Sequence, residues 1–341
     1  MAASPPTAQA QALLERAAQA GVHRLAIPTP FAVGHVNCWL IEDEPLTLVD
    51  TGPNSGKALD SLETALAEHG RRIEDLERIV VSHQHIDHEG LLAILARRSG
   101  AEVCALDVLG PWLEGFGEQQ EADDAFAAAM MHRHGISQDV VSALRAVTRI
   151  VRGWGAPGPV SRTLRDGEAL EFAGRSLRLW HRPGHSPTDT VLHDEDRGLL
   201  LAADHLLRHM SSSPVLTRPL QGDGEQRPRA LVAYLASMRA TRSMAGVEVV
   251  LPGHGDPFND TEVVIDERLR LHERRAARIE RLIAQGPRTA YEVGLDLWGG
   301  VALTQAYLCL SEVLGHVDLL LDRGVVVEQD AGKGVVRFSA V

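Results

Sequence analysis

Short apolar runs separated by turn residues occupy the first part of the chain. The runs at 25–27, 37–41 and 46–49 are rich in apolar and β-branched residues, and the last ends at the turn Asp50-Thr51-Gly52. Runs of this length between turn residues are typical of strands connected by hairpins. The run at 79–81 is apolar throughout, which predicts a strand buried on both faces.

Segments with helical spacing of apolar residues separate these strands from later ones. Leu59, Leu62 and Leu66 share one face of a helix predicted over 55–69, and a second helix is predicted to end at Gly100. A further helix is predicted over 229–244, and further strands at 101–106, 169–172, 176–180, 190–192, 198–203 and 247–251. Strands and helices in this order favour an α/β fold in which helices cover a central pair of sheets.

Three other regions depart from this alternation. Residues 107–152 are mostly helical in pattern, and a Gly/Pro-rich connector follows them. The pattern over residues 262–285 predicts one long arginine-rich helix, and we expect its charges to pair along the helix. The helices and two-stranded ribbon that follow resemble a small winged-helix domain. We expect a tail and helix over 1–21, a main domain over 22–261 with a helical insertion over 107–152, and a long helix plus winged-helix-like domain over 262–341.

The composition is that of an ordinary globular protein. The chain has 341 residues, of which 44% are hydrophobic and 23% charged, and this length favours about two domains. Cys38, Cys104 and Cys309 are far apart, which argues against a disulfide framework and against a thiolate zinc site. The chain lacks the apolar stretch of a membrane-spanning helix, and its start lacks the pattern of a secretory signal. We therefore expect a cytoplasmic protein with no membrane segment.

The charge of the chain disfavours nucleic acid as a partner. The formal net charge is −12, and a net acidic chain is repelled by a phosphate backbone. Residues 286–341 carry four basic and seven acidic side chains, so DNA binding by the winged-helix-like segment is also disfavoured. We expect this segment to serve packing, with a homodimer as one possibility.

Histidines lie where the strands end. The chain has 16 of them, and the densest group directly follows the apolar run 79–81 in the segment Ser82-His83-Gln84-His85-Ile86-Asp87-His88. Side chains alternate along extended backbone, so His83 and His85 share one face. Asp87 and His88 lie past the bend where a helix begins. This one loop can therefore supply ligands to two neighbouring metal ions.

Three further candidate ligands, His185, Asp204 and His254, also follow predicted strands. Loops at one edge of a layered fold converge, so we expect these side chains to meet the histidine-rich loop. His83, His85 and His185 would bind one metal ion, and Asp87, His88 and His254 the second, with Asp204 bridging them. A single histidine beside a strand is usually structural, but this many buried ionisable groups would be costly without a cation.

These seven residues, in this order and spacing, resemble the metallo-β-lactamase superfamily over about residues 22–260. The resemblance implies a four-layer αββα fold. The context Asp204-His205-Leu206, the segment 251–257 and the tail are similar to those of the lactamase-beta-2-like hydrolases. The pair Asp87 and His88 is similar to that of the binuclear hydrolases, hydroxyacylglutathione hydrolase among them. The separation of 97 positions between His88 and His185 and the different tail disfavour glutathione specificity.

The resemblance implies a binuclear hydrolase in which a metal-bridging hydroxide attacks a carbonyl. Two Zn²⁺ ions are the expected cofactors, with iron or manganese as alternatives, and Asp87 and Asp204 are the expected catalytic residues. The leading hypothesis is a thioesterase-like hydrolase of a small-molecule or carrier-linked acyl group. The alternatives are a metal-dependent ribonuclease or phosphodiesterase, and a lactonase or β-lactamase-type activity.

The residues around the metals are less specific. Asp50 is either a turn cap or the partner that orients a ligand imidazole, and His205 either lines the pocket or is structural. We expect the insertion 107–152 to govern substrate choice and not to bind metal, so His132 and His134 are excluded as ligands. The candidate pocket residues are Phe31, His35, Trp112, Phe116, Met130, Met131 and the segment His209-Met210-Ser211.

Overall fold

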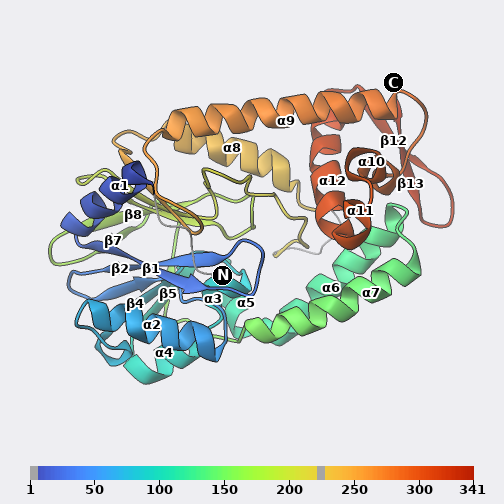
Figure 1. Ribbon diagram of the computed structural model, residues 1–341. Helices are drawn as coiled ribbons and strands as arrows, with labels where there is room; N and C mark the ends of the chain where they lie inside the picture. Colours follow the sequence, from blue (N-terminus) through green and yellow to red (C-terminus); the bar gives the residue numbers. More distant parts are fainter. Residues whose placement is uncertain (1–6, 221–226) are drawn as a thin grey trace.

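Two β-sheets packed face to face form the centre of the molecule, as a computed structural model shows for residues 7–220 and 227–341 (Figure 1). The first sheet has six strands, which lie in chain order: β1 (Val22–Pro28), β2 (His35–Ile41), β3 (Thr47–Val49), β4 (Arg78–Val81), β5 (Glu102–Leu106) and β6 (Arg162–Leu164). The second has five strands, in the spatial order β11 (Val249–Pro252), β10 (Leu199–Ala203), β9 (Thr190–Asp194), β8 (Ser176–His181) and β7 (Ala169–Glu171).

The pairing of the strands follows from the lengths of their connections. Strands β1 to β3 are antiparallel and joined by short turns, as predicted. Strands β3 to β6 are parallel, and each connection between them crosses over through helical segments. The hydrophobic pattern did not predict β6, because two of its three residues, Arg162 and Thr163, are polar.

Helices cover the outer faces of both sheets (Figure 1). Helices α2 (Gly56–Glu68) and α4 (Leu92–Ser99) lie on the first sheet, and α8 (Ala230–Arg242) and the start of α9 (Thr261–Ile283) lie on the second. Apolar residues of both sheets, such as Val80 and Leu201, meet in one core between them. This is the predicted four-layer αββα arrangement.

The N-terminal segment begins with helix α1 (Ala8–Gln19), whose first turn is capped by the Thr7 hydroxyl, which accepts a hydrogen bond from the amide of Ala10 at 3.2 Å. Leu13 and Ala17 of this helix join the main core. The loose start of the predicted tail lies outside the described residues. Residues 221–226, between β10 and α8, also lie outside the described residues.

The insertion over 107–152 is helical, as predicted. It forms α5 (Gly110–Glu114), α6 (Phe116–Arg133) and α7 (Gln138–Val151). In Figure 1 the last two helices run away from the sheets and reach the C-terminal helices.

The C-terminal segment contains three helices and a small sheet. These are α10 (Ala290–Trp298), α11 (Val301–Thr304), α12 (Ala306–Asp322) and the antiparallel ribbon of β12 (Val326–Asp330) and β13 (Val336–Ala340). Gln305 separates α11 from α12.

The insertion and the C-terminal segment share one hydrophobic core. Met131, Ile136 and Val141 of the insertion pack in the same cluster as Leu314 and Phe338 of the C-terminal segment. The two segments are more than a hundred positions apart in sequence, so the hydrophobic pattern alone did not show that they meet. The shared core fixes the insertion and the C-terminal helices relative to each other.

Helix α8 connects this second core to the sheets. A Cβ atom on Gly315 of α12 would lie 2.7 Å from Cβ of Leu231 in α8, so the glycine permits a close helix crossing. Arg227, just before α8, pairs with Asp318 of α12 through Nη1 and Oδ2 at 2.7 Å. Both contacts hold the C-terminal helices against the layer that covers the second sheet.

Several charges of α9 pair with side chains outside this helix, and within the described residues no ion pair joins two residues of α9, so the prediction that they pair along α9 itself is wrong. Asp266 accepts from Arg242 of α8 at 2.7 Å, Glu273 pairs with Arg323 after α12 at 2.8 Å, and Arg275 pairs with Glu312 of α12. A long helix that touches several elements finds partners across each packing contact. No described helix is both long and apolar enough to cross a membrane.

We predict that Leu314→Ala lowers the free energy of unfolding by about 2–5 kcal/mol, because it opens a cavity in the shared core. Leu314 is fully buried. Urea denaturation followed by circular dichroism measures the change. The matched control is Leu303→Ala, at a position that is 49% exposed, with an expected change within about 0.5 kcal/mol. Equal effects of the two variants would contradict the shared core.

Candidate metal centre

The seven predicted ligands come together at one edge of the two sheets. His83 and His85 follow β4, and Asp87 and His88 lie in the short helix α3 (Ile86–Glu89). The other three each follow or end a strand of the second sheet: His185 after β8, Asp204 after β10 and His254 after β11. Three overlapping groups of these side chains have ligand atoms within 4.8 Å of one another.

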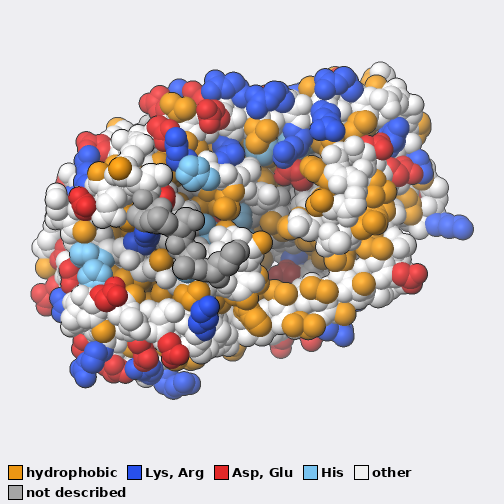
Figure 2. All heavy atoms as spheres, in the orientation of Figure 1, with side chains coloured by type: hydrophobic (Ala, Val, Ile, Leu, Met, Phe, Trp, Pro, Cys, Tyr) orange, Lys and Arg blue, Asp and Glu red, His pale blue; other side chains and the backbone are white. Residues whose placement is uncertain are grey.

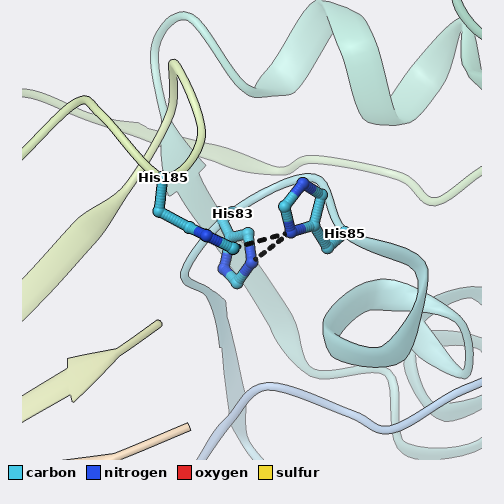
Figure 3. Close-up of side chains that lie close together, drawn as sticks. All are labelled: His83, His85 and His185. Carbon is cyan, nitrogen blue, oxygen red and sulfur yellow. Dashed lines mark hydrogen bonds between the residues drawn. The ribbon is translucent and has the colours of Figure 1, made fainter. Parts of the chain in front are cut away.

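The first group consists of three imidazoles that point toward one another (Figure 3). Nδ1 of His85 lies 3.1 Å from Nε2 of His83 and 2.9 Å from Nε2 of His185. Nδ1 of His185 faces the carbonyl of Ser213 at 3.2 Å and so carries the proton, which leaves a lone pair on its Nε2. Three imidazole nitrogens that direct their lone pairs to one point form a donor set that suits zinc.

A hydrogen-bond chain fixes the tautomer of His83 as well. The Ser82 hydroxyl donates to Oδ2 of Asp50 at 2.8 Å, so it can only accept from Nδ1 of His83, at 2.9 Å. Nε2 of His83 is therefore also a lone-pair donor. Hydrogen bonds of this kind, from a ligand imidazole to a neighbouring side chain, set the tautomer and the orientation of the ligand in metal sites.

The second group combines imidazoles with carboxylates. Nε2 of His254 lies 3.4 Å from Oδ2 of Asp87 and 3.4 Å from Oδ2 of Asp204. The same Oδ2 of Asp204 lies 3.5 Å from Nε2 of His185, which belongs to the first group. Asp204 thus stands between the two groups, as a bridging carboxylate must.

Two buried polar atoms of this group, Nε2 of His88 and Oδ1 of Asp204, have no hydrogen-bond partner in the described part of the chain. They lie 3.5 Å apart. Nδ1 of His88 donates to Oδ2 of Asp50 at 2.8 Å, so Nε2 of the neutral imidazole carries a lone pair that faces a carboxylate oxygen. Buried acceptors that face each other are unfavourable by themselves. A cation between them removes the conflict, so these residues fit a bound metal.

The electrostatics of the cluster favour the same conclusion. Burial lowers the pKa of His83 well below its usual value and that of His85 to about 3, which keeps both imidazoles neutral and able to bind a cation. Burial also disfavours the charged form of His254, but Asp204 outweighs it and raises the pKa of His254 to about 10. Burial would raise the pKa of Asp204, yet His254 and His88 hold it well below its usual range. The carboxylates attract positive charge, which metal ions can supply.

The backbone is strained where it enters the site. Asp50 and Ala203, each at the end of a strand, have φ angles of 61° and 43°, a left-handed conformation that residues other than glycine rarely adopt. A Cβ atom on Gly253 would lie 2.3 Å from Oδ1 of Asp204, so only glycine lets the end of β11 approach the ligands. Such strain is characteristic of functional sites, where the surrounding structure maintains it.

The structure decides between the two interpretations of Asp50 and those of His205. Asp50 accepts hydrogen bonds from the amide and hydroxyl of Ser82 and from His88, so it orients ligands in addition to ending a turn. Nε2 of His205 bonds to the hydroxyl of Thr241 at 2.8 Å in a fully buried position, which is a structural role. His134 lies in the second core, where it stacks on Phe338, and is in none of the metal-binding groups found in the described residues.

A cavity of about 560 Å³ begins at His85 and Asp87 and extends away from the sheets. Trp112 and Met131, two of the predicted pocket residues, line it. Figure 2 shows the molecule hollowed between the insertion and the C-terminal helices, with hydrophobic side chains along the rim. Phe31, His35, Phe116, Met130 and the segment 209–211 are not among the lining residues.

The sequence pattern missed two segments of the cavity wall, 215–218 and 304–308. The second includes Tyr307 and Leu308 at the start of α12. The segment 304–308 lies far from the ligand motifs in sequence, and packing brings it to the same cavity as His85 and Asp87. It also missed Asp189, which is fully buried and accepts a hydrogen bond from the amide of Ser186 at 2.9 Å, beside the ligand His185.

Comparison with known proteins gives consistent results. A model of the metallo-beta-lactamase superfamily matches residues 32–254. The probable metallo-hydrolase YqjP of Bacillus subtilis (strain 168) is 30% identical over 299 residues, which cover 87% of this chain and 91% of that protein. The acyl-coenzyme A thioesterase MBLAC2 of Gallus gallus is 31% identical over 191 residues, which cover 52% of this chain and 56% of that protein. The crystal structure of a metallo-beta-lactamase family protein from Thermus thermophilus aligns with a TM-score of 0.77 and 28% identity, and it covers 94% of this chain and 99% of that one.

We predict that Asp50→Asn weakens zinc binding by about 10–100-fold, since an amide cannot accept all three hydrogen bonds that orient Ser82 and His88. Competition with a chromophoric chelator measures the affinity. Asp60→Asn, on the exposed side of α2, is the matched control and should bind zinc like the unmodified chain. Unchanged affinity in a folded Asp50→Asn protein would mean that Asp50 serves the turn alone.

A second prediction concerns stoichiometry. The unmodified chain should bind about two equivalents of zinc, Asp204→Ala less than one, and His254→Ala about one, because Asp204 faces both groups and His254 only one. Elemental analysis after growth with added zinc and gel filtration measures this. Fewer than one equivalent in the unmodified chain, or two in Asp204→Ala, would contradict a two-metal site.

Proposed function

Because the chain belongs to the metallo-β-lactamase superfamily of metal-dependent hydrolases, we propose that it hydrolyses acyl thioesters. The observation that carries this proposal is the cavity that joins the ligand residues His85 and Asp87 to a largely apolar wall. A wall of this kind binds hydrocarbon, while the metal edge provides the hydrolytic chemistry. The relative named as an acyl-coenzyme A thioesterase supports this substrate class.

The residues that would hold the metals follow from the geometry of the cluster. His83, His85 and His185 would hold one ion, and Asp87, His88 and His254 the other, with Asp204 shared. We propose zinc as the native metal, while iron and manganese remain compatible with this mixed set of nitrogen and oxygen donors. When bound, the two ions supply Lewis acidity at the scissile carbonyl and make water acidic enough to be a nucleophile near neutral pH.

The side chains of the protein provide the remaining steps. Asp87 lines the cavity, and although burial disfavours its charged form, His254 and His88 lower its pKa, so it is an ionised carboxylate. We assign it the role of orienting the attacking water and accepting its proton. Asp204 keeps the two groups of ligands at a fixed separation. No serine or cysteine nucleophile is required.

The cavity wall provides the binding surface for the acyl group. Trp112 and Met131 come from the insertion, and Tyr307 and Leu308 from the C-terminal segment. We propose that the segment 262–341, with its winged-helix-like order of elements, serves as this wall and not as a DNA-binding module. The net charge of −12 disfavours a polyanion such as RNA, which makes the ribonuclease alternative weaker than the thioesterase.

We predict that the zinc-loaded protein hydrolyses acyl-CoA thioesters, and that Met131→Ala raises KM for a medium-chain acyl group by about tenfold through lost apolar contact. Thiol release detected with a disulfide reagent gives the rates, and the variant should still contain two zinc ions. Val327→Ala, at an exposed position on the ribbon, is the control. The same preparations are assayed with RNA, a lactone and a β-lactam. Activity on one of these without thioester hydrolysis would contradict the proposal.

A further inference from the structure

One wall of the cavity carries an arginine that has no counter-ion among the described residues. Arg145 of α7 lines the cavity beside Leu144 and Thr148. Its Nε atom is buried and has no hydrogen-bond partner, and within residues 7–220 and 227–341 its guanidinium forms no ion pair. An unpaired guanidinium at a mostly apolar wall is unfavourable unless a ligand pairs with it.

The two carboxylates of the same wall are already engaged. Asp123 pairs with Nε of Arg218 at 2.8 Å and accepts from Nε1 of Trp112 at 3.3 Å. Asp124 pairs with Arg152, which also donates to the carbonyl of Gln120 at 2.7 Å. Within each of these two ion pairs the carboxylate neutralises its arginine. Neither carboxylate is therefore left to pair with Arg145.

Around Asp124, too, positive side chains outnumber negative ones among the described residues. Burial raises the pKa of Asp124, and Arg152, Arg145 and Arg149 act against this, so all three arginines lie near it. Glu121 is the other carboxylate that affects it, and its side chain is exposed to solvent. Three cations therefore face two carboxylates, and Arg145 is the one of the three that lines the cavity.

We propose that Arg145 binds an anionic group of the substrate inside this cavity. This inference rests on the proposed thioesterase function and specifies its substrate class. The planar guanidinium matches a carboxylate or a phosphate through paired hydrogen bonds, and both are oxyanions. The oxyanion is either a carboxylate at the far end of the acyl group or a phosphate of the carrier arm. In both cases the apolar side chains between Arg145 and the metal edge contact the methylene groups of the substrate.

A set of four thioesters separates these two sources. Octanoyl and suberyl groups have the same chain length, but only suberyl ends in a carboxylate. Each is attached to N-acetylcysteamine, which has no phosphate, and to coenzyme A, which has several. The rates, as kcat/KM, are measured for the zinc-loaded unmodified chain, Arg145→Gln and Arg145→Lys, with Arg149→Gln as the matched control because Arg149 is exposed and does not line the cavity.

A preference for suberyl over octanoyl on both carriers that falls about tenfold or more in Arg145→Gln supports a distal carboxylate. A preference for coenzyme A over N-acetylcysteamine that falls by the same factor supports a carrier phosphate. In either case Arg145→Lys should restore part of the preference and Arg149→Gln should leave it unchanged. Calorimetric titration with suberate and with free coenzyme A gives a second readout that does not depend on turnover.

Equal changes for all four substrates, or no change, would overturn the proposed anion site while leaving the thioesterase function intact. Failure of the unmodified chain to hydrolyse any of the four would overturn both proposals. Thermal melting and zinc content of each variant exclude a loss of fold or metal as the cause.

Discussion

The need for positive charge among buried carboxylates is the constraint on which the rest of the site depends. Asp50, Asp87 and Asp204 are each at most 8% exposed. The imidazoles around them already use Nδ1 in hydrogen bonds to a hydroxyl, a carboxylate or a carbonyl group. In the absence of cations this cluster can be neutralised only by protons on His88 and His254. The strained backbone at Asp50 and Ala203 and the close approach at Gly253 are maintained because they bring the ligands to one point.

The cavity beside this cluster is built by a different part of the fold. The insertion and the C-terminal helices share one hydrophobic core, so the two walls of the cavity cannot move independently. Helix α8 anchors that core to the second sheet through the contact between Leu231 and Gly315. Substrate choice can therefore change through wall residues such as Met131 or Tyr307 without disturbing the metal ligands, as is usual for folds that support several activities.

Charge and burial together favour a thioester as substrate. The chain as a whole is acidic, while the cavity wall combines apolar side chains with paired ions and with Arg145, which has no ion pair within residues 7–220 and 227–341. A polyanion would meet the repulsion of the acidic surface, whereas an acyl chain with a single anionic group matches both the wall and its one spare cation. The proposal on Arg145 thus specifies the proposal on the substrate, and the same cavity wall supports both.

The sequence by itself determined the layered α/β fold and the seven ligand candidates. Buried strands show as apolar runs such as 79–81, and ligands that follow strand ends, such as His185, must meet at the sheet edge whatever the details of packing. Which residues line the cavity was decided only by the tertiary structure. Tyr307, Leu308 and Arg145 lie far from the motifs in sequence, and the partners of the α9 charges come from other helices. Periodicity reports which face of an element is buried, but the element that covers this face is chosen by packing between distant segments.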